Sequence, residues 1–151
     1  VAARGTLGAA VGAAVSVPPS FRVALNVGAP RFVAPFGQAA QVVPGRAVAV
    51  AGIARPERFF ASAREAGWTI EREMVFADHH WFTAGDWRKV RAAAEAAGVA
   101  TVLTTEKDAV RLERIVAGEP AGMHVCYLPI DLVLDEALEA WLRTRLAERA
   151  A

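Results

Sequence analysis

Residues 46–67, RAVAVAGIARPERFFASAREAG, carry the signals of a buried β-strand followed by an α-helix. The strand is the valine-rich run at 46–51, and Gly52 ends it. Pro56 stands where the helix begins, because a proline at the first helical position loses no hydrogen bond. Gly67 ends the helix. The segment therefore predicts one strand–helix unit of an α/β protein.

The same alternation of strands and helices continues along the chain. Thr83 and Gly98 are typical of the residues that begin and end a helix. Strand patterns lie at 21–27, 68–76, 99–103 and 124–129, and helix patterns lie at 84–97, at a short segment ending at Leu112, and at 135–150. We therefore predict an α/β fold, a three-layer Rossmann-like domain with a mainly parallel sheet flanked by helices.

Length and composition limit the classes of protein that fit. The chain has 151 residues, about the size of one domain, and its 54% hydrophobic content excludes intrinsic disorder. The net charge of +1 argues against a dedicated nucleic-acid binder. A single cysteine, Cys126, excludes a disulfide framework and a multi-cysteine zinc site, and favours the cytosol or a cytosol-facing surface.

Positive charge is concentrated near the N-terminus. Five arginines and no acidic residue precede Glu57, so this segment carries +5 and the remainder −4. Such a segment suits an anionic lipid surface or a phosphorylated substrate, and a GC-rich genome accounts for it equally well. The Gly/Ala-rich run at 6–17 is shorter than the roughly 20 apolar residues that span a bilayer. Since the first residue is Val1, we expect the chain to begin inside a longer parent protein.

The sequence contains neither of the two common glycine-rich nucleotide-binding loops. A Walker loop needs Gly-x-x-x-x-Gly-Lys followed by Ser or Thr, so that backbone amides and the lysine hold the phosphates. Lys89 and Lys107 are the two lysines, and neither follows a glycine. The Gly-x-Gly-x-x-Gly pattern of dinucleotide-binding proteins is also absent.

Three polar motifs follow predicted strands, at 52–60, 78–80 and 104–108. Functional groups gather beyond the carboxyl ends of parallel strands, so we expect the three motifs at one edge of the sheet.

The first candidate site is Asp78-His79-His80, a carboxylate followed by two imidazoles. One interpretation is a general base or a histidine that orients a base. A second is the metal site of a phosphoesterase with an Asp-His-His signature, although no aspartate precedes Asp78 as that signature requires. The third is structural, a helix-capping aspartate with two surface histidines.

The second candidate site is Thr104-Thr105-Glu106-Lys107-Asp108. One interpretation is a helix cap, in which Thr105 accepts amide hydrogen bonds and Asp108 completes a capping box. The other is a polar patch that faces a ligand or a partner domain. The two interpretations are compatible.

Four motifs in this order resemble the C-terminal half of the tetraacyldisaccharide 4'-kinase family of the lipid A pathway in Gram-negative bacteria. They are AGIARPERFF at 51–60, FADHH at 76–80, TTEKDAVRL at 104–112 and YLPI at 127–130. The resemblance extends from about Val43 to Leu146 and is less clear before Val43. It divides the chain into residues 1–42, an N-terminal linker or partial segment of the parent protein, and residues 43–151, the C-terminal α/β domain of the kinase.

The resemblance implies transfer of the ATP γ-phosphate to the 4'-hydroxyl of tetraacyldisaccharide 1-phosphate. It implies that ATP and Mg²⁺ are bound mainly by an N-terminal phosphate-loop domain, a partner that this chain lacks. It also implies a peripheral location at the cytoplasmic face of the bacterial inner membrane, with no nucleic-acid partner.

The resemblance also implies roles for individual residues. In the family, the histidine of the Asp-His motif supports a catalytic aspartate of the other domain, which makes His79 and Asp78 the catalytic candidates here. No residue is assigned to a metal. The implied substrate-binding or domain-interface residues are Thr105, Glu106, Lys107 and Asp108.

The missing phosphate loop predicts that these 151 residues are inactive alone, as a fragment, a truncated gene product or half of a split enzyme. An alternative of a different class is a non-catalytic α/β module that binds a partner domain or an anionic glycolipid. The basic N-terminal segment favours that alternative.

Overall fold

The computed structural model describes residues 19–119 and 122–150. The chain divides into two compact units, Ala24–Val133 and a second unit whose described residues are 19–23 and 134–150. The elements in chain order are β1 (Val23–Val27), β2 (Arg31–Phe32), β3 (Arg46–Ala51), α1 (Pro56–Glu65), β4 (Thr69–Val75), α2 (Ala84–Ala97), β5 (Thr101–Thr105), α3 (Glu106–Val116), β6 (His124–Leu128), β7 (Ile130–Leu134) and α4 (Glu136–Ala150).

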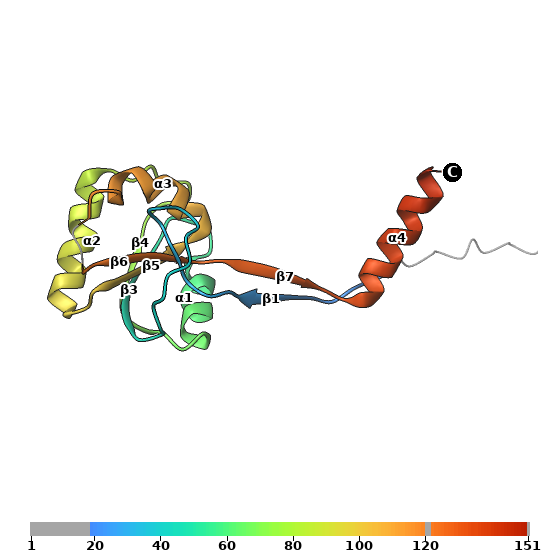
Figure 1. Ribbon diagram of the computed structural model, residues 1–151, viewed down its shortest axis with the longest axis horizontal. Coiled ribbons are helices and arrows are strands. Elements are labelled where there is room, and N and C mark those ends of the chain that lie inside the picture. The colour runs from blue at the N-terminus through green and yellow to red at the C-terminus, as the bar shows by residue number, and fades with distance from the viewer. Residues whose placement is uncertain (1–18, 120–121, 151) are drawn as a thin grey trace, which may run out of the picture. The chain divides into compact units, whose positions relative to one another are not determined.

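A five-stranded sheet forms the centre of the unit Ala24–Val133, in the order β2-β6-β5-β3-β4. The pairs β6–β5, β5–β3 and β3–β4 are parallel, and the edge strand β2 is antiparallel to β6. Helices α2 and α3 cover one face of this sheet and α1 covers the other (Figure 1). The three-layer α/β fold with a mainly parallel sheet is confirmed.

Strand β3 shows how the sequence separates the two faces. Successive side chains of a strand point to opposite faces. The alanines of β3 pack with the large rings of Phe59 and Phe60 from α1. Its valines Val48 and Val50 pack with α2 and α3, through residues such as Val90 and Leu112. The residues 47–51 are all buried, so each face has a continuous apolar core.

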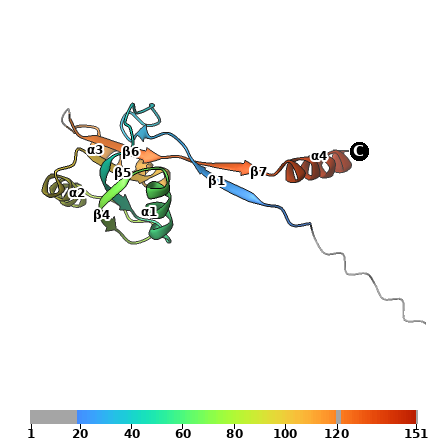
Figure 2. The same cartoon turned by 90° about the horizontal axis from the view of Figure 1, so that it is seen from below.

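The second sheet contains two strands, β1 and β7. Strand β7 follows β6 after Pro129. Gly28, directly after β1, donates its backbone N–H to the Pro129 carbonyl at 2.9 Å. Figure 2 shows β1 and β7 side by side.

The second unit contains helix α4, which agrees with the predicted helix at 135–150. Trp141 of this helix lies with its ring centroid 5.6 Å from that of Phe21. The Arg145 guanidinium lies 5.7 Å from the centroid of the Trp141 ring, within the range of a cation–π contact. No helix in the described part of the chain is long and apolar enough to cross a membrane.

The predicted elements are largely confirmed, with four differences. Helix α3 continues to Val116 instead of ending at Leu112, and β5 includes the two threonines that were expected beyond it. Strands β2 and β7 were not predicted. Strand β4 was predicted to be half buried, but it is an edge strand with five of its seven residues exposed. The Gly/Ala-rich run at 6–17 lies outside the described residues. The boundary at residue 42 stays a prediction.

Candidate functional site

The three polar motifs meet at the backbone of Gly52. The Gly52 N–H donates to Oδ2 of Asp108 at 2.8 Å, and the Gly52 carbonyl accepts from the His79 N–H at 3.1 Å. A Cβ atom on residue 52 would lie 3.3 Å from Oδ1 of Asp108 and 3.4 Å from the Ala77 carbonyl oxygen. This approach is tight, so a side chain at residue 52 would press on the Asp108 carboxylate. Segments that are far apart in the sequence are therefore joined at the carboxyl edge of β3, as the sheet topology predicts.

Asp108 supplies a buried carboxylate at the centre of the site. Its side chain is fully buried, and besides the Gly52 amide it accepts the Thr105 hydroxyl proton at 2.8 Å. Arg111, one turn further along α3, lies with Nη1 3.3 Å from Oδ1 of Asp108. Three donors from different parts of the site therefore bind one carboxylate, which offsets the cost of removing its charge from water.

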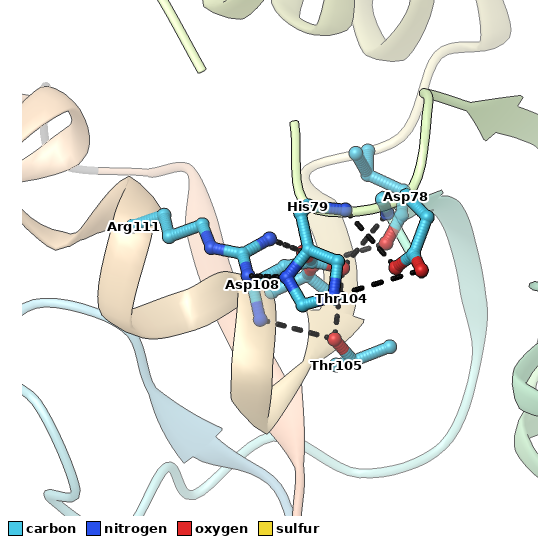
Figure 3. Close-up of polar contacts among 8 residues, drawn as sticks. Asp78, His79, Thr104, Thr105, Asp108 and Arg111 are labelled. Atoms are coloured by element: carbon cyan, nitrogen blue, oxygen red, sulfur yellow. Dashed lines mark hydrogen bonds and ion pairs between the residues drawn. The ribbon is translucent and has the colours of Figure 1, made fainter. Parts of the chain in front are cut away.

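Arg111 connects this buried carboxylate to His79 (Figure 3). Its Nη2 atom lies 3.2 Å from Nδ1 of His79. A guanidinium has no acceptor, so Nδ1 must accept and a neutral ring carries its proton on Nε2. Nε2 lies 3.7 Å from Oδ2 of Asp78, on the other side of the ring. The imidazole is therefore held between a cation and a carboxylate, and its side chain is 68% exposed.

The backbone at His79 also has an uncommon conformation. Its φ is 59°, in the left-handed region, where histidine is one of the few non-glycine residues with some preference. The His79 N–H donates to the Gly52 carbonyl and, at 3.0 Å, to Oδ1 of Asp78. These bonds stabilise a turn that presents the ring at the sheet edge. A left-handed non-glycine residue costs about 1–3 kcal/mol and is frequent at functional sites.

His80 points to a different set of partners. Its Nε2 lies 3.0 Å from Oδ2 of Asp86, and its ring packs against Phe76 and Phe82 at centroid distances of 4.9 and 5.1 Å. Hydrogen bonds from His80 and then from Thr83 lower the pKa of Asp86 to about 2. Asp86 and Thr83 also form the capping box of α2. His80 therefore has a structural role, packing the turn onto the start of α2.

The other predicted site residues differ in exposure. Thr105 and Asp108 are buried and take part in the hydrogen-bond network, while Glu106 and Lys107 are exposed. The predicted helix cap is confirmed, because the Thr105 hydroxyl accepts from the Asp108 N–H at 3.1 Å. The predicted capping box is wrong for α3, since the Asp108 carboxylate binds Gly52 instead of the Thr105 backbone. Arg111 was not assigned to the site from the sequence; its spacing of three residues from Asp108 was the available signal.

The metal-site interpretation of Asp78-His79-His80 has no geometric support. The two imidazoles bind separate partners, Arg111 and Asp86. Within residues 19–119 and 122–150, no group of three His, Cys, Asp or Glu side chains could hold a metal ion. We therefore assign no Mg²⁺ ligand to the described residues, and no step below passes through a metal.

Comparisons with known proteins give a consistent result. The family model described as Tetraacyldisaccharide-1-P 4'-kinase matches residues 9–147, which includes most of the segment before Val43 where the resemblance was less clear. The tetraacyldisaccharide 4'-kinase of Methylobacterium sp. (strain 4-46) is 43% identical over 115 residues, which are 76% of this chain and 32% of the relative. That of Methylobacterium nodulans is 44% identical over 110 residues, with 72% and 30% covered.

A solved structure has a similar fold. It is LpxK from Aquifex aeolicus in complex with ATP, with a TM-score of 0.53 and 19% identity. The alignment covers 81% of this chain and 34% of that chain. This chain therefore spans about a third of the length of the relatives that it matches.

Proposed function

The chain belongs to the tetraacyldisaccharide-1-P 4'-kinase family, and on that premise we propose that it is the C-terminal α/β part of such a kinase. The reaction transfers the ATP γ-phosphate to the 4'-hydroxyl of tetraacyldisaccharide 1-phosphate. The substrate carries acyl chains that partition into a bilayer, so we further propose that the protein works as a peripheral enzyme at the cytoplasmic face of the inner membrane.

ATP and Mg²⁺ belong, in this proposal, to an N-terminal phosphate-loop domain. The 151-residue sequence has no Walker loop, and the chain covers about a third of its relatives. Phosphoryl transfer depends mostly on positioning and charge stabilisation. The contribution proposed for this chain is therefore to close the site and to position a group at the sugar hydroxyl.

The observation that carries the proposal is the orientation of the His79 imidazole. Arg111 binds Nδ1 at 3.2 Å, which leaves the Nε2 proton available to a further acceptor. We propose that Nε2–H donates to a carboxylate of the N-terminal domain and holds it where it accepts the proton of the 4'-hydroxyl. Asp78 restricts the orientation of the ring from the Nε2 side, where its Oδ2 lies 3.7 Å from Nε2.

The experiment is a graft of this chain onto the Methylobacterium sp. (strain 4-46) relative, in place of the segment that it matches. The assay follows phosphate transfer from ATP to tetraacyldisaccharide 1-phosphate. We expect turnover by the graft and none by the 151-residue chain alone. A graft that folds and binds ATP but transfers no phosphate would reject the proposal in favour of a non-catalytic module. Turnover by the 151-residue chain alone would reject the proposal that an N-terminal domain binds ATP and Mg²⁺.

A further inference from the structure

Arg111 lies between the buried carboxylate of Asp108 and the exposed ring of His79 (Figure 3). Its Nη1 atom is 3.3 Å from Oδ1 of Asp108, and its Nη2 atom is 3.2 Å from Nδ1 of His79. The two contacts use two different nitrogens of one rigid, planar group. The direction of the His79 ring is therefore tied to the position of the Asp108 carboxylate.

The carboxylate that anchors Arg111 is itself fixed by other groups. Oδ2 of Asp108 accepts from the Gly52 N–H and from the Thr105 hydroxyl, each at 2.8 Å. The Asp108 side chain is fully buried and that of Arg111 is 16% exposed. Among the residues that the structure describes, Asp108 is the only carboxylate that pairs with Arg111. The guanidinium is therefore a donor with a fixed position, unlike the mobile head of a surface arginine.

Packing contributes little to the orientation of the His79 ring. The side chain is 68% exposed, and no aromatic ring in the described part of the chain stacks on it. His80, by contrast, packs against both Phe76 and Phe82. The χ2 angle of a histidine has two broad minima, and exposed side chains change rotamer within nanoseconds. The orientation of the His79 ring therefore depends on its polar contacts.

Of the two polar contacts of this ring, the one with Arg111 is the shorter. The distance of 3.7 Å from Nε2 to Oδ2 of Asp78 exceeds the roughly 2.7–3.2 Å of a direct N–H···O hydrogen bond. A ring that is turned over, or that carries its proton on Nδ1, would present a C–H or an N–H to the guanidinium, which has no acceptor. Arg111 therefore selects the orientation and the tautomer in which Nε2 carries the proton.

We propose that Arg111, anchored by Asp108, is a positioning residue that holds the His79 imidazole in the orientation and tautomer that the phosphate transfer requires. The inference rests on the proposed function for the identity of the group that receives the Nε2–H bond. The orientation of the ring does not depend on that identity. A purely structural ion pair within α3, or a direct contact of Arg111 with a phosphate, would give different results in the tests below.

The first test records NMR spectra of the histidine ring nitrogens in the 151-residue chain, at about pH 9, where an ordinary imidazole is neutral. The chain contains three histidines, so His80 and His124 are internal controls. For His79 we expect a protonated Nε2 and an Nδ1 that accepts a hydrogen bond. Arg111→Met should move both His79 signals towards those of an imidazole that exchanges between tautomers, and leave the other two histidines unchanged. Unchanged His79 signals in this variant would overturn the proposal.

The graft tests the consequence for phosphate transfer. Arg111→Met should lower kcat roughly 10–100-fold, because a misplaced ring misplaces the group that it holds, and leave both KM values unchanged. Arg114→Met, at an exposed position of the same helix, should leave kcat unchanged. Arg111→Lys keeps a positive charge beside Asp108 but lacks the second nitrogen, so it should keep the urea midpoint and still lower kcat. Full kcat in either Arg111 variant would overturn the proposal.

A double-mutant cycle identifies the residue through which Arg111 acts. In a graft with His79→Gly, Arg111→Met should change kcat less than about twofold, because the ring that Arg111 orients is absent. A loss as large as that in the presence of His79 would show that Arg111 acts on α3 or on a phosphate, and would overturn the proposal. An inactive graft, together with His79 signals that respond to Arg111→Met in the chain alone, would reject the kinase function and leave the positioning of the ring supported.

Discussion

Replacement of the buried Asp108 should destabilise the unit Ala24–Val133 strongly. Asp108→Ala removes the acceptor of the Gly52 N–H and of the Thr105 hydroxyl, which bind it at 2.8 Å each. It also leaves the Arg111 guanidinium, whose side chain is 16% exposed, without its carboxylate. Removing one member of a buried ion pair costs about 3–5 kcal/mol, and we expect a loss of that size.

Asp108→Asn removes the negative charge of the side chain and keeps its shape. An asparagine keeps one oxygen for the Gly52 and Thr105 donors, but its NH₂ group then faces Arg111, which can only donate. We expect a loss of about 1–3 kcal/mol, the usual effect of an unsatisfied buried group, and release of Arg111 from its position.

The assay is urea unfolding followed by tryptophan fluorescence, because Trp68 and Trp87 are buried in this unit. The control is Asp131→Asn at an exposed position, where we expect a change within about 0.5 kcal/mol. If Asp108→Ala loses less than about 1 kcal/mol, the carboxylate does not hold the site together and the reasoning is wrong.

Three further outcomes are expected. Gly52→Ala should lower the free energy of unfolding by about 1 kcal/mol in urea titrations, since its Cβ would crowd Asp108, whereas Gly118→Ala, with open space around its Cβ, should not. Hydrogen bonds lower the pKa of Asp86 to about 2 in the folded protein, so the ionised carboxylate stabilises the fold above the pKa that Asp86 has in the unfolded chain. This stabilisation is lost as the pH falls towards 2. The difference in thermal midpoint between wild type and Asp86→Asn should therefore shrink between about pH 4 and pH 2. Burial raises the pKa of the Cys126 thiol to about 12, so a thiol reagent at pH 8 should label it only after unfolding in urea, which mass spectrometry would detect.

The strands could be predicted from the sequence where the pattern of apolar residues coincides with residues that are buried in the fold. Strand β3 has a continuous apolar run bounded by glycines, and its predicted bounds are the observed ones. The unpredicted strand β7 is apolar in sequence, but it directly follows Pro129 and is exposed along its whole length, so burial does not accompany its local signal. The two-residue β2 is too short for a local pattern and depends on pairing with β6. The bounds of β5 were misplaced because its last two residues are polar, although both are buried.

The candidate site could be predicted in its location but not in its connections. Parallel topology is sufficient to bring the three motifs to one edge. The bond from Gly52 to Asp108 joins residues 56 positions apart, so local spacing favoured a capping box instead. The contact of Arg111 with His79 depends on the left-handed backbone at residue 79, which the sequence does not reveal.

The most direct test of the role of His79 is the kcat of the graft with two substitutions at that position. His79→Ala removes the imidazole and strains the left-handed backbone, whereas His79→Gly removes the imidazole and suits a φ of 59°. If the imidazole positions the catalytic carboxylate, both variants should lose about 10²–10⁴-fold in kcat with an unchanged KM for ATP. A His79→Gly graft with the kcat of the unsubstituted graft would show that residue 79 supplies only a turn.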